Sequence, residues 1–205
     1  MPGTQPALLF DLYGVLIRHR KDEDRRAVEA SLGLPAEKRQ VFWDAYHELR
    51  APLDKGEVTD YVWWQEVAAS ADLPELNIDA AIQSETATLL RPHEESVAMV
   101  RELIAEGWRI GVLSNIPHIL GNGLKDKHTW FQEFHSVTYS CDIGEVKPEP
   151  AAYEVALHDL GSEAANTIFF DDTLANVTAA EEFGLQAVHY TEPADIARAV
   201  APWRS

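Results

Sequence analysis

The sequence has little of what secreted or membrane-spanning proteins usually contain. Cys141 is its single cysteine, which excludes an intramolecular disulfide and indicates a reducing compartment. No apolar stretch approaches the ~20 residues that span a bilayer. The segment from Met1 to Pro6 contains no basic stretch followed by an apolar run, so we expect no signal peptide. These absences favour a cytoplasmic protein.

Basic residues are also scarce. The chain has 17 Lys and Arg against 34 Asp and Glu, which gives a formal net charge of −17. A surface with this charge repels phosphate backbones and anionic lipids, so we expect neither a nucleic-acid nor a membrane partner. A site for an anionic substrate would have to be made locally positive by a metal ion, a lysine or backbone dipoles.

The residues that are present suffice for a packed core. Hydrophobic residues make up 46% of the 205 positions, enough for one sizeable domain or for a core domain with a small insertion. Short apolar runs typical of buried strands alternate with helical patterns. The alternation predicts a doubly wound, Rossmann-like α/β fold with a parallel sheet. The predicted strands are 7–10, 109–113, 137–139, 167–170 and 186–190.

One segment interrupts this alternation directly after the first strand. Residues 22–90 are helical in pattern and contain almost no strand-like run. Prolines and glycines divide them into three or four predicted helices. We therefore predict a core domain of residues 1–17 and 91–205 and an inserted helical cap domain of residues 18–90. The aromatic residues of the insertion should mostly fill the core of its helical bundle, with one or two facing the site; they are Phe42, Trp43, Tyr46, Tyr61, Trp63 and Trp64.

Polar residues follow four of the predicted strands. In open α/β sheets, ligands bind beyond the carboxyl ends of the strands, so these side chains should converge. Crowded carboxylates repel one another unless a cation is present, and hard oxygen ligands select Mg²⁺. The residues are Asp11 after the first strand, Ser114 and Asn115 after the second, Lys147 after the third, and Asp171 and Asp172 after the fourth.

Four segments around these residues resemble the haloacid dehalogenase-like (HAD) hydrolase superfamily, in the subgroup with a helical cap inserted after the first strand. They are Phe10–Leu16, Val112–Asn115, Val146–Pro150 and Phe169–Asn176, in the order of the family. The resemblance implies a Mg²⁺-dependent phosphatase of a small phosphorylated metabolite. Its nucleophile would be Asp11, which would form an aspartyl-phosphate.

The resemblance also implies roles for the other residues. Mg²⁺ would be held by Asp11, the backbone carbonyl of Tyr13 and Asp172, with Asp171 as a further ligand or a hydrogen-bonded support. Asn176 would support these ligands from one helical turn away. Three groups would bind the phosphate: the hydroxyl of Ser114, the backbone N–H of Asn115 and the ammonium group of Lys147, which is also a predicted catalytic residue.

Tyr13 is the main departure from the family pattern. Phosphatases of this superfamily often carry an aspartate two residues after the nucleophile, as general acid and base. A phenol has a reference pKa near ~10 and is a poor base at neutral pH, although it can donate a proton or a hydrogen bond. Tyr13 is therefore predicted to be catalytic only as a donor.

Two alternatives stay open. The 2-haloacid dehalogenases of the superfamily carry a tyrosine at this position, attack carbon without a metal and cradle the halide with an arginine. The paired Asp171 and Asp172 disfavour that chemistry, because without a cation they would repel each other, and Arg18 and Arg20 can equally be surface charges. The other alternative is a non-catalytic protein that keeps the scaffold. His19 and His118 could line the pocket, but each is expected to be an ordinary loop histidine and is assigned no role. The sequence assigns neither an individual substrate nor an oligomeric state.

Overall fold

A single parallel sheet organises the computed structural model, which describes residues 5–204. Its strand order is β3-β2-β1-β4-β5, so the chain builds outward from β1 in one direction and then in the other. This is the predicted doubly wound sheet. Each predicted strand is confirmed to within one residue at its ends: β1 (Ala7–Phe10), β2 (Ile110–Ser114), β3 (Ser136–Tyr139), β4 (Thr167–Asp171) and β5 (Gln186–His189).

Part of two predictions lies outside the described residues. Residues 1–4 belong to the segment in which no signal peptide is expected, and positions 1 and 205 are the outer limits of the predicted core domain.

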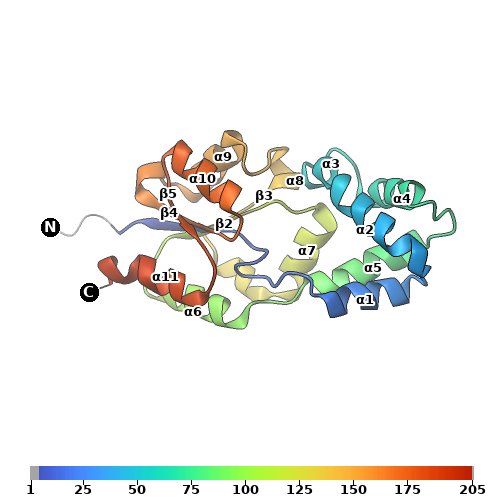
Figure 1. The fold of residues 1–205 in the computed structure, drawn as a ribbon. Coiled ribbons are helices and arrows are strands. Elements are labelled where there is room, and N and C mark those ends of the chain that lie inside the picture. The colour runs from blue at the N-terminus through green and yellow to red at the C-terminus, as the bar shows by residue number, and fades with distance from the viewer. Residues whose placement is uncertain (1–4, 205) are drawn as a thin grey trace.

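Helices cover both faces of the sheet (Figure 1). Side chains alternate along a strand, so Leu8 and Phe10 pack into one apolar cluster and Leu9 into another on the opposite face. The first cluster is covered by α6 (Glu94–Ala105), α7 (His118–Lys127) and α11 (Pro193–Val200), and the second by α9 (Pro150–Leu160) and α10 (Leu174–Phe183). Short helical segments complete this core lobe: α8 (Ser140–Ile143), η2 (Thr129–Glu133), η3 (Ala164–Asn166) and η4 (Ala201–Trp203).

The inserted residues form a separate helical lobe, at the right of Figure 1. Its buried apolar cluster contains Phe42, Trp43, Tyr46, Trp63 and Trp64, as predicted. Tyr61 is the exception, because half of its surface is exposed. The helices of this lobe are α1 (Asp22–Ser31), η1 (Ala36–Lys38), α2 (Arg39–Glu48), α3 (Arg50–Asp54), α4 (Asp60–Ser70) and α5 (Ile78–Leu89).

The expectation of three or four helices in this lobe was wrong, since the described chain forms five α-helices there. Pro52 accounts for the additional break. In a continuous helix its ring would clash with the carbonyl of Glu48, four residues earlier. The chain therefore ends α2 at Glu48 and starts α3 at Arg50, which places Pro52 in a first turn, where its missing N–H is tolerated.

The two segments that join the lobes lie side by side. The N–H of Arg18 donates to the carbonyl of Arg91 at 2.9 Å, and the N–H of His93 donates to the carbonyl of Leu16 at 2.7 Å. An antiparallel bridge pairs Ile17 with Pro92 between them. The helical lobe therefore leaves and rejoins the core lobe at one place.

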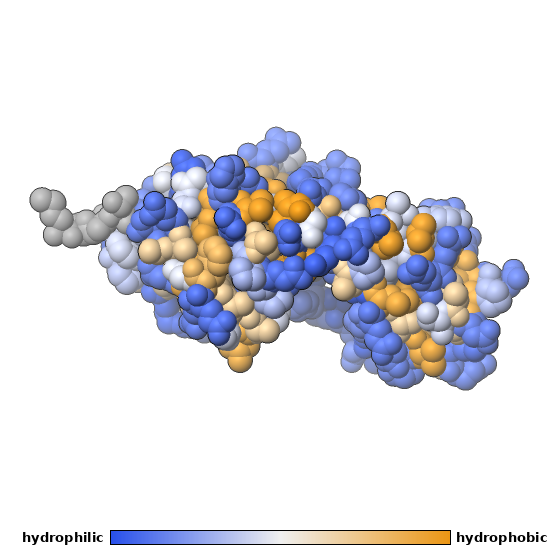
Figure 2. Space-filling model, turned by 90° about the horizontal axis from the view of Figure 1, so that it is seen from above, coloured by the Kyte–Doolittle hydropathy of each residue, from blue (hydrophilic) through white to orange (hydrophobic). Residues whose placement is uncertain are grey.

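Hydrophilic residues cover much of the face seen in Figure 2, where the outline narrows between the two lobes. Across residues 5–204, no helix combines the length and the apolar character that crossing a membrane requires.

Candidate active site

Three carboxylates meet at the carboxyl edge of the sheet. Phe10 and Phe170 are paired in the parallel register of β1 and β4, so the next residues, Asp11 and Asp171, lie beside each other. Asp172 follows directly, and one oxygen from each of the three carboxylates lies within 4.8 Å of the others. The strands are added in one direction from β1 to β3 and in the other direction from β4 to β5, so the order reverses between β1 and β4. Ligands of such folds usually bind at this point, beyond the carboxyl ends of the strands.

Lys147 supplies a positive charge inside this cluster. Its Nζ lies 2.8 Å from Oδ1 of Asp11 and 2.7 Å from Oδ2 of Asp171. Asn115 holds the backbone of Lys147: its amide donates to the carbonyl of Lys147, and its Oδ1 accepts from the N–H of Lys147, both at 2.8 Å. The sequence predicted a backbone role for Asn115, and this side-chain role was missed.

Burial and charge shift the pKa values of this pair. Burial raises the pKa of Asp11 to about 6; the charge of Lys147 opposes this shift and that of Asp171 adds to it. Burial lowers the pKa of Lys147, but attraction to Asp11 and Asp171 outweighs it, and the net shift is upward. Lys147 is therefore a permanent cation at neutral pH, surrounded by more negative charge than it neutralises.

Asp171 and Asp172 differ in burial and in the number of hydrogen bonds that their carboxylate oxygens accept. Asp171 is completely buried and accepts from Lys147, from the N–H of Thr173 at 2.8 Å and from Nδ2 of Asn176 at 3.1 Å. The side chain of Asp172 is 24% exposed. Asp172 is thus the accessible carboxylate and Asp171 the fixed one.

Ser114 ends β2, beside β1. Its hydroxyl is buried and has no hydrogen-bond partner among residues 5–204. Leaving a buried hydroxyl unpaired costs about 1–3 kcal/mol. A ligand oxygen at this position would satisfy it.

The backbone after Asp11 requires glycine at position 14. Gly14 has a φ of +86°, in the left-handed region. A Cβ atom there would lie 2.3 Å from Oδ2 of Asp172 and 2.6 Å from Nε2 of His19. The loop after β1 therefore approaches the carboxylates as closely as a backbone can.

Tyr13 and His19 line the side of the site that faces the helical lobe. The hydroxyl of Tyr13 donates to the carbonyl of Leu89 at 3.2 Å, and burial raises its pKa well above 10.0. Nε2 of His19 lies 2.7 Å from Oδ2 of Asp172, and this hydrogen bond raises the pKa of His19. The expectation of an ordinary loop histidine was therefore wrong for His19, and no motif around it predicted the contact with Asp172.

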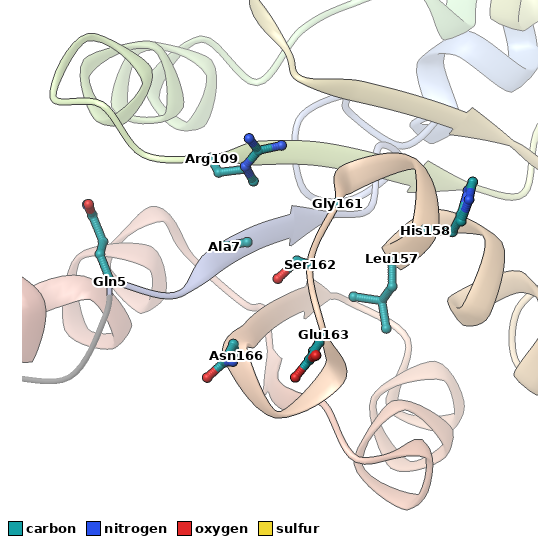
Figure 3. Close-up of a pocket in the computed structure, with 9 residues that line it drawn as sticks. All are labelled: Gln5, Ala7, Arg109, Leu157, His158, Gly161, Ser162, Glu163 and Asn166. Atoms are coloured by element: carbon teal, nitrogen blue, oxygen red, sulfur yellow. The ribbon is translucent and has the colours of Figure 1, made fainter.

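A cavity of about 530 Å³ lies away from the acidic cluster. It is near Ala7, Arg109 and Ser162, where β1 and β2 begin, so it is at the opposite end of the strands from the carboxylates (Figure 3). It contains no metal-ligating cluster among the described residues.

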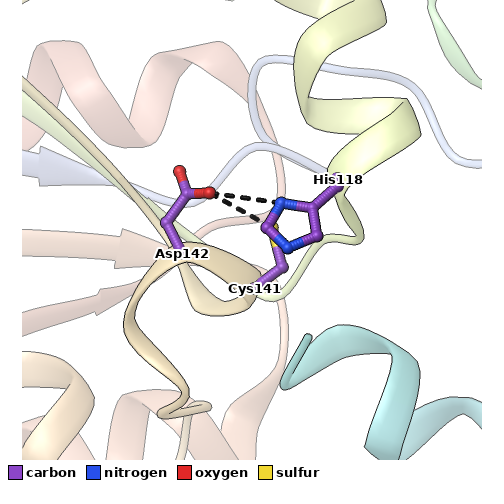
Figure 4. A group of neighbouring side chains, drawn as sticks. All are labelled: His118, Cys141 and Asp142. Carbon is purple, nitrogen blue, oxygen red and sulfur yellow. Dashed lines mark hydrogen bonds and ion pairs between the residues drawn. The ribbon is translucent and has the colours of Figure 1, made fainter. Parts of the chain in front are cut away.

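Figure 4 shows a second group of possible ligands, His118, Cys141 and Asp142. Nδ1 of His118 lies 3.3 Å from Oδ1 of Asp142, and both side chains are half exposed. Burial raises the pKa of the Cys141 thiol to about 12. The thiol is therefore protonated at neutral pH, whereas metal ions bind the thiolate.

Comparisons with known proteins agree on one family. A sequence model described as haloacid dehalogenase-like hydrolase matches residues 6–184. The sesquiterpene phosphatase astK of Aspergillus oryzae is 28% identical over 192 residues, which cover 94% of this chain and 93% of that protein. A phosphoglycolate phosphatase of Cereibacter sphaeroides is 24% identical over 202 residues, covering 91% and 85% of the two chains.

A solved structure confirms the fold. The HAD family enzyme bt-2542 of Bacteroides thetaiotaomicron, in complex with magnesium and inorganic phosphate, has a TM-score of 0.74 at 19% identity, covering 91% of this chain and 94% of that chain.

Proposed function

This chain belongs to the haloacid dehalogenase-like hydrolase family, and we propose that within it the protein is a Mg²⁺-dependent phosphatase of a small phosphorylated molecule. One observation carries the proposal: Asp11, Asp171 and Asp172 each place an oxygen within 4.8 Å of the others, and the buried ammonium group of Lys147 pairs with Asp11 and Asp171. The two relatives, both named as phosphatases, and the magnesium and phosphate bound to the structural neighbour support it.

The donor set fits Mg²⁺. The site has three carboxylates and one lysine, so its negative charge exceeds its positive charge, and all the donor atoms in the acidic cluster are hard oxygens. We propose Asp11, Asp172 and the backbone carbonyl of Tyr13 as ligands, with Asp171 as a further ligand or support held by Asn176. When bound, Mg²⁺ would neutralise the excess negative charge and polarise the phosphoryl oxygens.

The chain's own residues account for the covalent steps. A carboxylate oxygen of Asp11 attacks phosphorus, the ester P–O bond breaks, and the leaving oxygen takes up a proton. Water then attacks the phosphorus of the aspartyl-phosphate, the P–O bond to Asp11 breaks, and inorganic phosphate leaves as the carboxylate is restored. Lys147 and the unpaired hydroxyl of Ser114 stabilise the charge on the transferred group, together with the N–H of Asn115.

The leaving oxygen needs a proton donor, and Tyr13 is the residue predicted for this role. The role of Tyr13 as its donor stays a prediction, and the hydrogen bond to Leu89 opposes that role because it engages the phenolic proton. We therefore expect the enzyme to turn over good leaving groups most readily.

We propose that the helical lobe, residues 18–90, is a cap over a core of residues 1–17 and 91–205. A cap that covers the site favours small substrates over phosphoproteins. The expectations of a cytoplasmic location and of no nucleic-acid partner stay predictions.

The direct test is hydrolysis of p-nitrophenyl phosphate with and without Mg²⁺. We expect Mg²⁺-dependent turnover that Asp172→Ala weakens by raising the Mg²⁺ concentration needed. Asp142→Ala is the matched control, because it removes an acid from the His118 cluster. Turnover that is independent of Mg²⁺, or equal effects of the two variants, would contradict the proposal.

A 2-haloacid dehalogenase is the second candidate, and one observation favours it. Arg20 is half buried beside the site, with two guanidinium nitrogens that have no partner among the described residues. The three converging acids argue against this chemistry, which needs no metal. Metal-independent release of halide from 2-chloropropionate would establish it in place of the phosphatase.

A further inference from the structure

A cavity of about 360 Å³ lies between the two lobes and adjoins the acidic cluster. Tyr13 and His19 line it, and the His19 ring also contacts Asp172 at 2.7 Å. Tyr46, Leu89 and Leu120 form an apolar part of its wall. Its volume is within the range of small-molecule sites, roughly 300–1,000 Å³, so it has room for the part of a substrate beyond the phosphate.

Three arginines also line this cavity, in a chain with a net charge of −17. Arg50 is already neutralised, since its guanidinium lies 2.9 Å from Asp54 and 3.0 Å from Glu85. Arg20 and Arg25 form no ion pair with any carboxylate among residues 5–204. They are therefore the basic groups of the cavity that remain available to an anion.

Arg20 is held in place by aromatic rings. Its Cζ lies 5.0 Å from the ring centroid of Trp43 and 5.2 Å from that of Tyr46. Its Nε and Nη2 are buried and have no hydrogen-bond partner among the described residues. Stacking fixes the plane of a guanidinium but leaves its in-plane donors free for a bidentate acceptor.

Arg25 adds to the positive potential beside Arg20. Its Nη2 lies 2.9 Å from Nε2 of His47, and its Cζ lies 4.8 Å from the ring centroid of Trp43. Burial and the charges of Arg25, Arg20 and Arg50 lower the pKa of His47, which leaves its nitrogen neutral and able to accept from Arg25. The imidazole does not neutralise either arginine.

We propose that Arg20, assisted by Arg25, binds a second anionic group of the substrate, so that the substrate is a phosphate monoester bearing a carboxylate or a second phosphate. The apolar wall of the cavity packs against the segment between the two anions. This inference rests on the proposed phosphatase function and adds the class of its substrate.

The test compares matched probes with the purified full-length protein and Mg²⁺. The probes are phosphorylated ω-hydroxy acids of graded chain length, the alkyl phosphates of the same length, and the corresponding diol bisphosphates. We expect the best doubly anionic probe to exceed its alkyl phosphate in kcat/KM by roughly tenfold or more, mainly through KM. The acid and bisphosphate arms identify which second anion is preferred.

Arg20→Gln should bring the ratio of the two kcat/KM values close to one. Arg25→Gln should also lower this ratio, and it replaces Arg20→Gln in the test if that variant does not fold. The control is Arg26→Gln, which removes the same charge from an exposed position of α1 and should leave the ratio unchanged. The inference would be overturned if Arg26→Gln lowered this ratio as much as Arg20→Gln, or if the wild type did not prefer a doubly anionic probe at any chain length. If p-nitrophenyl phosphate is hydrolysed while that preference is absent, only this inference fails. If no phosphate ester is hydrolysed, the proposed function fails with it.

Discussion

Nζ of Lys147 lies 2.8 Å from Oδ1 of Asp11, and both residues are more than nine-tenths buried. The same ammonium group also neutralises Asp171, so it is the cation shared by two buried acids. The proposed nucleophile and the residue proposed to stabilise the transferred phosphoryl group therefore depend on each other before any substrate binds.

Lys147→Met tests this dependence. The substitution leaves Asp11 and Asp171 buried without their cation, and we expect it to lower the free energy of unfolding at pH 7 by about 3–5 kcal/mol. Urea unfolding in EDTA measures the loss. Lys38→Met breaks a surface ion pair with the exposed Asp72 and should cost much less. Similar losses in the two variants would contradict the buried-pair argument.

Asp11→Asn should abolish turnover, because a neutral amide does not attack phosphorus. It should also stabilise the metal-free protein at pH 7. The pKa of Asp11 is about 6 in the folded protein against an ordinary value of 3.8, so the folded state binds this proton more tightly. The resulting stabilisation is fully present below pH 3.8 and is lost as the pH rises through 6.

Thermal melts in EDTA at a series of pH values check this expectation. The wild type should lose stability relative to Asp11→Asn between pH 4 and pH 6 and should remain the less stable protein above that range. Parallel stability curves, or wild-type turnover by the variant, would refute the role assigned to Asp11.

Gly14→Ala should disrupt the acidic cluster. The new methyl group would lie 2.3 Å from Oδ2 of Asp172, so the carboxylate must move, and both Mg²⁺ affinity and turnover should fall. Gly33→Ala is the matched control, because Gly33 also has a positive φ, of +62°, but a methyl group there meets nothing within 4 Å. Gly33→Ala should lower the free energy of unfolding by about 1–2 kcal/mol, the cost of placing a Cβ atom on a left-handed backbone, and should leave Mg²⁺ affinity unchanged. Normal Mg²⁺ affinity in Gly14→Ala would show that the close approach is unimportant.

Tyr13→Phe asks what the phenol does. General acid catalysis contributes typically 10²–10⁴-fold. Since the hydroxyl already donates to Leu89, we expect a loss below roughly tenfold for alkyl phosphates and for p-nitrophenyl phosphate alike. A much larger loss with alkyl phosphates, whose leaving groups need a proton, would identify Tyr13 as the proton donor after all.

The sequence predicted the sheet well because each strand of a parallel sheet is an unbroken apolar run bounded by turns. The convergence of Asp11, Asp171 and Asp172 followed from one rule, that parallel strands end at a common edge. The number of inserted helices was less predictable, since helical periodicity continues through Leu49 and only the steric demand of Pro52 separates α2 from α3.

The individual contacts of His19 and Arg20 were not predictable from the sequence. Both lie on the segment that leads into the helical lobe, where no periodic pattern fixes the direction of a side chain. His19 reaches Asp172 across more than 150 positions of sequence, and Arg20 is placed by Trp43 and Tyr46 of α2. Such contacts arise only from tertiary packing.

The hydrogen-bonded pairing of residues 16–18 with residues 91–93 allows the insertion between them to be removed or replaced as a unit. Because its two ends are already neighbours, a short turn can close the gap at little entropic cost. The sheet and the acidic edge would be retained in such a shortened chain. Another helical segment grafted at the same pair of connecting segments would then give a new cavity wall beside an unchanged acidic cluster.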